Sequence, residues 1–320
     1  MGFKKILGQE KAVETLKGFI SSGRIPRAMI FHGPAGCGKA MTALEFAKTL
    51  NCMDEASNKV YDNCSLCVNC KHIDAKTHPD VIFADFAYQA ALRKEEVEKQ
   101  QSIKVDTVRA LTAASQQKPV LAKWKVYIID SAETLLAEGA NALLKFIEEP
   151  PQNTVWILIS SKKEAMLSTI KSRCQAVAFA PLPEDILINI LKDNFVEDSI
   201  ARRAVKYAQG SSAKAMSAAE ILNDIAALPG GAAFPTAFAL NLPRTLAVSR
   251  AQVSFALDML AVAAHESWIN GKDDACGEEL KNLLSKLVFY KKAVARNVSP
   301  AMVAEAAFIS AARQGISLKD

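Results

Sequence analysis

The sequence predicts an α/β domain with a parallel sheet and a phosphate-binding loop, followed by an all-helical part. Short apolar runs rich in β-branched residues alternate with helical patterns in the first half of the 320-residue chain, as expected for strands buried on both faces of a parallel sheet. A glycine-rich segment follows the first of these runs and precedes a helical pattern. Pro181-Leu182-Pro183 then ends the alternation, and only helical patterns are recognised from Glu184 onward.

The predicted elements of the first half are strands and helices in turn. The strands are expected at Ala28–His32, Val81–Phe83, Val126–Ile129, Val155–Ile159 and Ala176–Phe179. Helical spacing of apolar residues predicts helices at Met41–Leu50, Val105–Ala114, Leu135–Glu149 and Glu164–Ile170. This order is typical of a doubly wound α/β domain.

The second half is predicted to contain helices and one irregular connection. The stretch Pro229–Pro243 has two glycines and three prolines, which predicts a linker. Helices are expected near Thr245–Ile269, Glu278–Arg296 and Pro300–Gln314. We recognise no internal repeat and no low-complexity tract.

Composition and charge indicate a soluble cytoplasmic protein without a membrane segment. The formal net charge of +5 results from 39 basic and 34 acidic residues spread along the chain, which permits an acidic partner without arguing for one. The N-terminal residues Met1–Ile20 mix charged with apolar residues and lack an apolar signal core. No later stretch is expected to be apolar for the length that a membrane span requires.

Residues 33–40, Gly-Pro-Ala-Gly-Cys-Gly-Lys-Ala, match the phosphate-loop pattern G-x-x-x-x-G-K-[ST] at seven of its eight positions. The expected nucleotide contacts come from Gly33, Gly36, Cys37, Gly38, Lys39 and Ala40. Backbone N–H groups of such a loop cradle phosphates, and Lys39 would reach the terminal ones. Ala40 has no hydroxyl to bind magnesium, which argues against the metal. Whether ATP or ADP is bound stays open, and a glycine turn without ligand is the alternative.

Asp130 ends an apolar strand, where a second metal-directed acid belongs in this class of nucleotide-binding protein. In active ATPases of the oligomeric class the next residue is a glutamate that polarises the attacking water, and here it is Ser131. A hydroxyl is a poor base near neutral pH. Glu133 is interpreted as an acidic residue in the first turn of the following helix, pointing elsewhere.

Cys52, Cys64, Cys67 and Cys70 place four of the seven cysteines within nineteen residues. Four thiolates at this density are typical of a closed tetrahedral zinc site that folds a short insert. Disulfides are the alternative, but a cytoplasmic chain would keep its thiols reduced. His72 is near enough in sequence to be an alternative ligand. A closed site has no open coordination position, so we expect no catalysis there.

Ser172-Arg173-Cys174 follows the polar end of a predicted strand and a helical stretch. An arginine presented across a subunit boundary can stabilise charge that builds on a phosphate in a neighbouring site. Taken alone, an arginine at a helix end is a solvated cation near a favourable dipole.

Together these segments resemble the delta-prime subunits of the bacterial DNA polymerase III clamp loader, members of the AAA+ family. The resemblance extends to about residue 215 and includes Leu7-Gly8-Gln9-Glu10, the glycine loop, Leu50-Asn51-Cys52, Thr77-His78-Pro79-Asp80, Val105-Asp106-Thr107-Val108-Arg109, Asn141-Ala142-Leu143-Leu144-Lys145, Glu148-Glu149-Pro150-Pro151 and Ser172-Arg173-Cys174. The related gamma/tau motor subunit shares the loop, the cysteines and the Ser-Arg-Cys triplet. The Thr-His-Pro-Asp and Val-Asp-x-Val-Arg segments look more like delta-prime, as do the missing hydroxyl and glutamate.

The resemblance implies three domains: an AAA+ domain over residues 1–180 with a zinc module at 52–70, a helical lid over 181–228 and a C-terminal helical collar over 229–320 that oligomerises. It implies a hetero-pentameric ring with gamma/tau and delta subunits, which loads a sliding clamp on primer-template DNA. Arg173 would be the arginine finger offered in trans to the motor subunit's ATP. Lys214 stands near where active relatives carry a nucleotide-sensing arginine, which weakens the case for hydrolysis in cis.

Two other functions stay open on the sequence. One is a gamma/tau-like ATPase in which another group replaces Ala40 and Ser131. The other is a zinc-stabilised nucleic-acid-binding protein without ring partners. The basic residues are scattered and not interleaved with aromatic residues, which is more typical of solvated faces than of a nucleic-acid interface.

Overall fold

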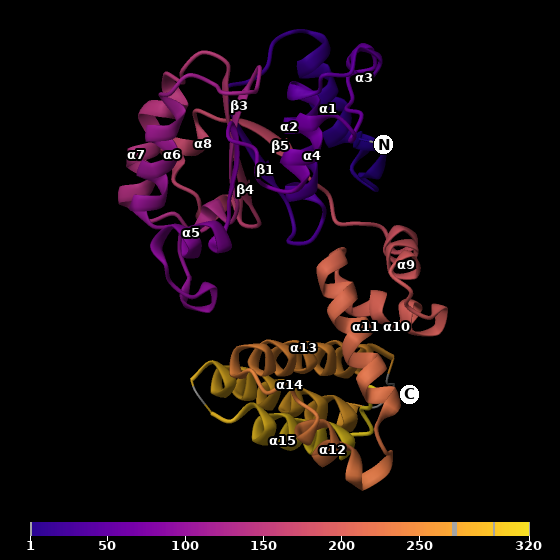
Figure 1. Cartoon of the computed structure of the whole chain (residues 1–320). Coiled ribbons are helices and arrows are strands. Elements are labelled where there is room, and N and C mark those ends of the chain that lie inside the picture. The colour runs from indigo at the N-terminus through magenta and orange to yellow at the C-terminus, as the bar shows by residue number, and fades with distance from the viewer. Residues whose placement is uncertain (1, 271–273, 297, 320) are drawn as a thin grey trace. The chain divides into compact units, whose positions relative to one another are not determined.

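The computed structural model describes residues 2–270, 274–296 and 298–319 (Figure 1). The chain divides into two compact units, Met1–Pro183 and Glu184–Asp320. The first unit contains a sheet with helices on both faces, and the second is built of helices (Figure 1).

The sheet of the first unit has five strands in the order β2-β3-β4-β1-β5. The strands are β1 (Ala28–His32), β2 (Val81–Ala84), β3 (Lys125–Ile129), β4 (Thr154–Ser160) and β5 (Gln175–Ala178). All neighbouring strands are parallel. Each predicted strand is confirmed to within a residue or two because a strand buried on both faces must be apolar along its length. The central strands β3 and β4 are buried throughout.

Helices cover both faces of this sheet. Figure 1 shows α1 (Glu10–Ser21), α2 (Lys39–Asn51) and α4 (Val68–Asp74) on one face, and α6 (Val105–Ser115), α7 (Ala137–Glu148) and α8 (Ser168–Lys171) on the other. The shorter elements are η1 (Gly2–Lys5), α3 (Glu55–Lys59), α5 (Phe86–Arg93), η2 (Val97–Lys99), η3 (Ala132–Thr134) and η4 (Lys163–Ala165). Under α6–α8 the core is centred on Tyr127 and Trp156, whose rings stack with centroids 4.6 Å apart.

The single helix expected at Glu164–Ile170 is wrong. The structure has η4 and the one-turn helix α8, separated by Met166 and Leu167 in extended conformation. Met166 and Ile170 are both buried in the core beneath the sheet face. The tertiary packing of these two side chains overrides the local helical spacing.

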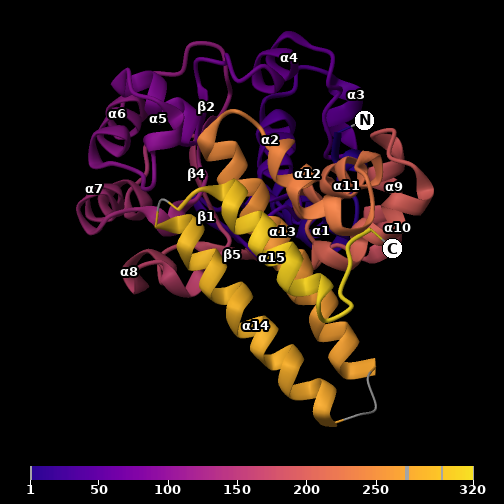
Figure 2. The same ribbon diagram turned by 90° about the horizontal axis from the view of Figure 1, so that it is seen from below.

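The second unit contains α9 (Glu184–Asp193), α10 (Asp198–Ala208), α11 (Ser212–Ala227), η5 (Gly231–Ala233), α12 (Phe234–Leu240), α13 (Leu246–Asn270), α14 (Asp274–Ala295) and α15 (Pro300–Ala312). The helix α10 packs on α11, and α13 packs on both α14 and α15. Figure 2 shows these last three helices lying alongside one another. The three helices expected after Pro243 are therefore confirmed.

The irregular connection expected at Pro229–Pro243 is only partly correct, because α12 forms within it. Phe234 and Phe238 lie one helical turn apart and contact Phe308 of α15 edge to face, with ring centroids 5.1 Å and 4.8 Å from it. Pro235 occupies the first turn of α12, where a missing N–H costs nothing. Burial of this aromatic cluster stabilises a helix that the local Gly and Pro content argued against.

One helix, α13, does not meet the expectation that no stretch is apolar for the length of a membrane span. Its segment Leu246–Ile269 is long and apolar enough to cross a membrane by length and composition, with a mean hydropathy of 1.4. The segment packs on α14 and α15. The core helix of a helical bundle passes the same test of length and composition, so this feature does not by itself indicate a membrane span.

Candidate functional site

The glycine loop between β1 and α2 is held in a shape that only glycine tolerates at two positions. A Cβ at Gly33 would lie 2.2 Å from the carbonyl oxygen of Phe179, just beyond β5. Gly38 has a φ of 95° and is the residue before the first turn of α2, a conformation that L side chains rarely adopt. The loop therefore fits closely between two strand ends and opens a helix, as a phosphate cradle does.

Lys39 begins α2 and its side chain is folded back onto the loop. Its Nζ donates a hydrogen bond to the carbonyl oxygen of Gly33 at 2.7 Å and another to that of Pro34. The same Nζ lies 3.8 Å from the Sγ of Cys37. Burial raises the pKa of the Cys37 thiol, although the Lys39 charge opposes this. The Lys39 ammonium group therefore lies beside the glycine loop. Phosphate oxygens bound there would replace the loop carbonyls as its hydrogen-bond acceptors.

Position 40 has no hydroxyl, and the next one along the helix does not replace it. Ala40 is the second residue of α2. Thr42 is fully buried and its Oγ1 donates to the carbonyl oxygen of Gly38 at 2.9 Å. The Thr42 hydroxyl is therefore committed to the helix backbone, and the loop keeps the phosphate-binding parts without this magnesium ligand.

Asp130 follows β3 directly and lies at the carboxyl edge of the sheet, as the sequence predicts. Its Oδ1 accepts a hydrogen bond from the backbone N–H of Ser131 at 2.8 Å. Burial raises the pKa of Asp130, and the nearby carboxylates of Asp85 and Glu133 add to this effect. Ser131 has a φ of 55°. The residue in the position of the water-polarising glutamate is therefore a serine in a left-handed turn.

Glu133 lies in the first turn of η3, as the sequence predicts for an acidic residue after the strand. Its Oε1 accepts hydrogen bonds from both the backbone N–H and the hydroxyl of Ser161, at 3.2 Å and 2.5 Å. Burial alone would raise the Glu133 pKa, but these bonds outweigh it and lower the pKa. Glu133 therefore joins the ends of β3 and β4 beside Asp130. The contact with Ser161 could not be predicted from the sequence because the two residues are far apart along the chain.

The four cysteines predicted to bind zinc come together in one cluster. Their sulfur atoms all lie within 4.8 Å of one another, and those of Cys52 and Cys64 are 3.6 Å apart. Zinc–sulfur bonds of about 2.3 Å in a tetrahedron place the sulfurs about 3.8 Å apart, so the residues fit the metal. A disulfide requires about 2.05 Å, and the four thiols are free.

Backbone geometry orients these sulfur ligands. Cys52 directly follows α2, Cys67 precedes α4, and Cys70 lies in α4. The backbone N–H groups of Leu66 and Cys67 donate to the Sγ of Cys64, at 3.4 Å and 3.2 Å. Such N–H···S contacts stabilise a thiolate. They are the kind of support expected around a metal ligand.

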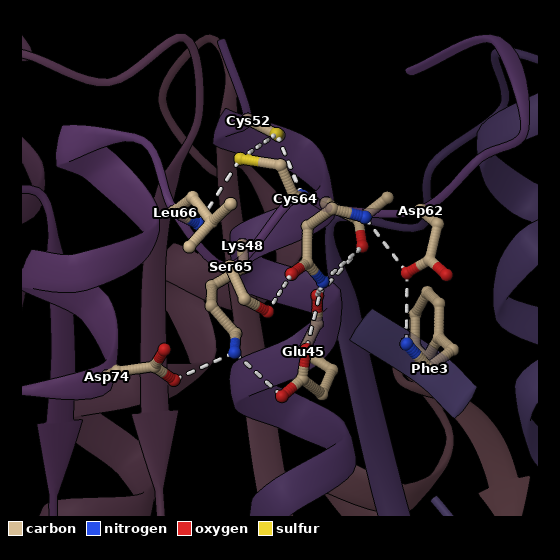
Figure 3. A network of polar contacts seen from close by, with 11 residues as sticks. Phe3, Glu45, Lys48, Cys52, Asp62, Cys64, Ser65, Leu66 and Asp74 are labelled. Atoms are coloured by element: carbon tan, nitrogen blue, oxygen red, sulfur yellow. Dashed lines mark hydrogen bonds and ion pairs between the residues drawn. The ribbon is translucent and has the colours of Figure 1, made fainter. Parts of the chain in front are cut away.

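A buried polar network connects the cysteine cluster to α2 (Figure 3). Lys48 of α2 has a fully buried side chain and pairs with Glu45 and Asp74, each at 2.7 Å. Burial would lower the Lys48 pKa, but the hydrogen bonds that its ammonium donates to these two carboxylates raise it. Asn63, next to Cys64, donates to the Oε2 of Glu45 at 2.9 Å. One helix therefore runs from the glycine loop to the cysteine cluster and is joined to both.

The Ser172-Arg173-Cys174 triplet forms the turn between α8 and β5. Cys174 packs against the core, and burial raises its pKa to about 12. The Arg173 side chain is 41% exposed and forms an ion pair with Glu148, the last residue of α7. The inward cysteine anchors the turn, and the arginine between it and Ser172 is directed outward.

Two other residues singled out by the sequence lie apart from these sites. The Nδ1 of His72 lies 3.1 Å from the hydroxyl of Thr77, outside the cysteine cluster. Lys214 lies in α11 of the second unit, where its Nζ donates to Gln209 at 2.9 Å.

The comparisons with known proteins agree with this architecture. The family model described as "DNA polymerase III, delta subunit" matches residues 8–183, more than half of the chain. The chain belongs to this clamp-loader family. The match covers the glycine loop, the cysteine cluster and the Ser-Arg-Cys turn, so all three belong to the clamp-loader part of the sequence.

Individual clamp-loader relatives cover the same region. The chain is 33% identical over 183 residues to DNA polymerase III subunit gamma/tau of Mycobacterium bovis, covering 57% of this chain and 29% of that protein. It is 32% identical over 194 residues to DNA polymerase III subunit delta' of Bacillus subtilis, covering 61% of this chain and 54% of that protein. The match therefore spans less than a third of the first relative and about half of the second.

A solved structure supports the fold over nearly the whole chain. It is the crystal structure of a DNA polymerase III gamma subunit-related protein from Thermotoga maritima, with a TM-score of 0.55 at 15% sequence identity. The alignment covers 95% of this chain and 99% of that one. At this identity the likeness establishes the fold, a parallel α/β domain followed by helices, and leaves the function to the residues.

Proposed function

We propose that this protein is a delta-prime-type clamp-loader subunit that supplies Arg173 in trans to the ATP site of a neighbouring motor subunit. The observation that carries the proposal is a contrast within the first unit. Arg173 is presented outward on an anchored turn, while the chain's own nucleotide site has alanine at position 40 and serine at position 131. A subunit with these parts acts best on the nucleotide of its neighbour.

The physical role of Arg173 is to stabilise charge during phosphoryl transfer. A guanidinium brought to the terminal phosphate from an adjacent subunit offsets negative charge that builds in the transition state. Such an arginine typically contributes a factor of about 10³ or more in rate, or roughly 4 kcal/mol. The exposed position of Arg173 supports this role, since a buried arginine could not reach another subunit.

The remaining parts of the proposal rest on what membership of the clamp-loader family implies. We infer a hetero-pentameric ring with gamma/tau and delta subunits in the cytoplasm, acting on the sliding clamp and primer-template DNA. The lid would span residues 181–228 and the collar 229–320. Zinc at Cys52, Cys64, Cys67 and Cys70 would be structural, since four thiolates leave no open position for catalysis. ATP or ADP in the loop at Gly33–Lys39 would be static, because Ala40 provides no magnesium ligand.

The decisive experiment is Arg173→Ala in a clamp loader rebuilt from the full-length chain and the partner subunits of its own organism. DNA-stimulated ATPase should fall by about a hundredfold or more because the transition-state charge loses its partner. Ring assembly, measured by size-exclusion chromatography with light scattering, should be unchanged. An unaltered ATPase rate would refute the finger role.

One observation favours the alternative of a gamma/tau-like ATPase. The Oε2 of Glu133 is buried and has no hydrogen-bond partner among the described residues, and Glu133 lies beside Asp130 at the nucleotide edge of the sheet. Its carboxylate could stand in for a glutamate at position 131. ATP hydrolysis by the purified chain that is lost in Glu133→Gln would favour this alternative. Nucleotide titration with and without magnesium would complete the comparison.

The hypothesis of a zinc-stabilised nucleic-acid-binding protein without ring partners has no such observation in its favour. Membership of the clamp-loader family supports the first proposal instead. Binding of primed DNA by the isolated chain at physiological salt, measured by fluorescence anisotropy, would be needed to revive it.

A further inference from the structure

The guanidinium of Arg173 is held at two of its three nitrogens by its own chain. Its Nε donates to the Oε1 of Glu148. Its Nη1 lies 3.1 Å from the carbonyl oxygen of Thr169 and 3.3 Å from the hydroxyl of Ser172. The Nη2 group, with two N–H donors, forms no hydrogen bond or ion pair within the described residues. Nε and Nη1 are therefore fixed, and Nη2 is left to bind something outside the chain.

The acceptors that hold Arg173 lie on rigid parts of the fold. Glu148 is the last residue of α7, and this helix is anchored by Leu143 and Ile147 in the core beneath the sheet. Thr169 lies in α8, next to the buried Ile170. Both acceptors are also near helix carboxyl ends, where the helix dipole favours a cation. The position of the guanidinium is thus set by the core of the domain and not by the turn alone.

We propose that Glu148 is the positioning residue of Arg173. By engaging Nε, it orders a long flexible side chain before a partner arrives and directs the Nη2 edge outward. This inference rests on the proposed function, because the target of that edge is the neighbouring subunit's nucleotide. Pre-ordering lowers the entropic cost of bringing the guanidinium to the transition state.

The expected size of the effect is modest because both side chains are about half exposed, 41% for Arg173 and 45% for Glu148. Exposed ion pairs of this kind change an equilibrium by at most about fivefold. Removing Glu148 should therefore cost far less than removing Arg173. Removing Glu148 should lower the catalytic rate and leave ATP binding unchanged, because the arginine acts in the transition state.

The test uses Glu148→Ala and Glu148→Gln in the rebuilt clamp loader, with Glu149→Gln as the matched control. Glu149 is the adjacent exposed carboxylate and forms no hydrogen bond or ion pair with Arg173. Glu148→Ala should lower kcat of the DNA-stimulated ATPase by about two- to fivefold with KM for ATP unchanged. Glu148→Gln, whose amide oxygen can still accept from Nε, should fall between Glu148→Ala and wild type. Glu149→Gln should match wild type.

A double variant separates positioning from a general structural effect. If Glu148 acts only through Arg173, the variant Arg173→Ala with Glu148→Ala should have the same rate as Arg173→Ala alone. Additive losses, a loss confined to KM, or equal effects of the Glu148 and Glu149 variants would overturn the inference. Each of these results leaves the finger role of Arg173 standing.

A measurement on the isolated full-length chain keeps the two proposals distinguishable. The Nε–H proton of Arg173, followed by NMR, should exchange with water several-fold more slowly in wild type than in Glu148→Ala. If Arg173→Ala leaves the ATPase unchanged, the proposed function fails while this signal still reports whether the pair exists. Equal exchange in wild type and Glu148→Ala would overturn the pairing itself.

Discussion

At the scale of single residues, Asp80 illustrates how one carboxylate can organise a whole segment. Asp80 directly precedes β2 and is almost fully buried. Its side chain accepts hydrogen bonds from the backbone N–H groups of Val120, Leu121 and Ala122, at 2.7–2.9 Å. Burial would raise the Asp80 pKa, but these bonds lower it. The aspartate of the Thr-His-Pro-Asp segment therefore has a structural role that holds the approach to β3.

We expect Asp80→Asn to lower the free energy of unfolding by about 2–3 kcal/mol, because charge-assisted hydrogen bonds to buried N–H groups are lost. The folded-state pKa is depressed, so this stabilisation is present above the ordinary aspartate pKa of 3.8 and lost as the pH falls through the folded-state pKa. Urea unfolding at several pH values measures both effects.

The control for Asp80 is Glu138→Gln, which changes an exposed carboxylate of the same unit to an amide. Its unfolding free energy should stay within about 0.5 kcal/mol of wild type. If Asp80→Asn were as stable as this control near neutral pH, the role of the carboxylate would be disproved.

At the scale of elements, α2 is the helix that connects the two candidate sites. Its first residue, Lys39, contacts the glycine loop, and Cys52 directly follows its last residue. Between them, Lys48 is buried between two carboxylates. A buried charge is tolerated only when it is paired, so removing one member of such a group is costly.

We expect Lys48→Met to lower the free energy of unfolding by about 3 kcal/mol, since Glu45 stays buried without its cation. The four cysteines are untouched, so one zinc per chain should still be measured by elemental analysis. A chelator should remove the zinc faster than from wild type, because the network that holds the cysteine segment on α2 is broken.

Two further variants serve as controls for Lys48→Met. Lys59→Met changes an exposed lysine of the same segment and should leave unfolding and zinc release unchanged. Cys67→Ser should lose the zinc outright. Zinc release from Lys48→Met at the wild-type rate would show that the network does not support the metal site, and a fully folded wild type without metal would end the zinc assignment.

At the scale of the whole molecule, the chain has two units with separate cores. Gln9 connects the beginning of the first unit to its last residues. Its side-chain Nε2 donates to the carbonyl oxygen of Ala180 at 2.7 Å, and its Oε1 accepts from the N–H of Ala180 at 3.0 Å. The chain then passes through Pro181 and Pro183 into α9. The structural division after Pro183 lies close to the boundary at residue 180 proposed from the sequence.

We expect a fragment of residues 1–183 to fold alone, because its sheet core is complete within the first unit. The fragment should bind one zinc and unfold cooperatively in circular dichroism. Limited proteolysis of the full chain should cut first near residues 181–184. A fragment without a cooperative transition would contradict the assignment of this unit as an independent domain.

Sequence patterns predicted the elements best where burial is regular. Strands β1–β4 are mostly apolar because both faces are covered, and each was located from its composition alone. Pattern failed at α8 and α12, where tertiary contacts of Met166, Ile170 and Phe234 override the local preference. Those contacts come from residues distant in sequence, which local propensity cannot include.

The sequence by itself determined the parallel sheet, the glycine loop, the cluster of four cysteines and the Ser-Arg-Cys turn. It could do so because each depends on residue types at fixed short spacings. Only the tertiary structure decided that Glu133 contacts Ser161 and that Glu148 holds Arg173, pairs separated by 28 and 25 residues. Contacts between segments this far apart depend on how the strands and helices pack, and no local pattern encodes that packing.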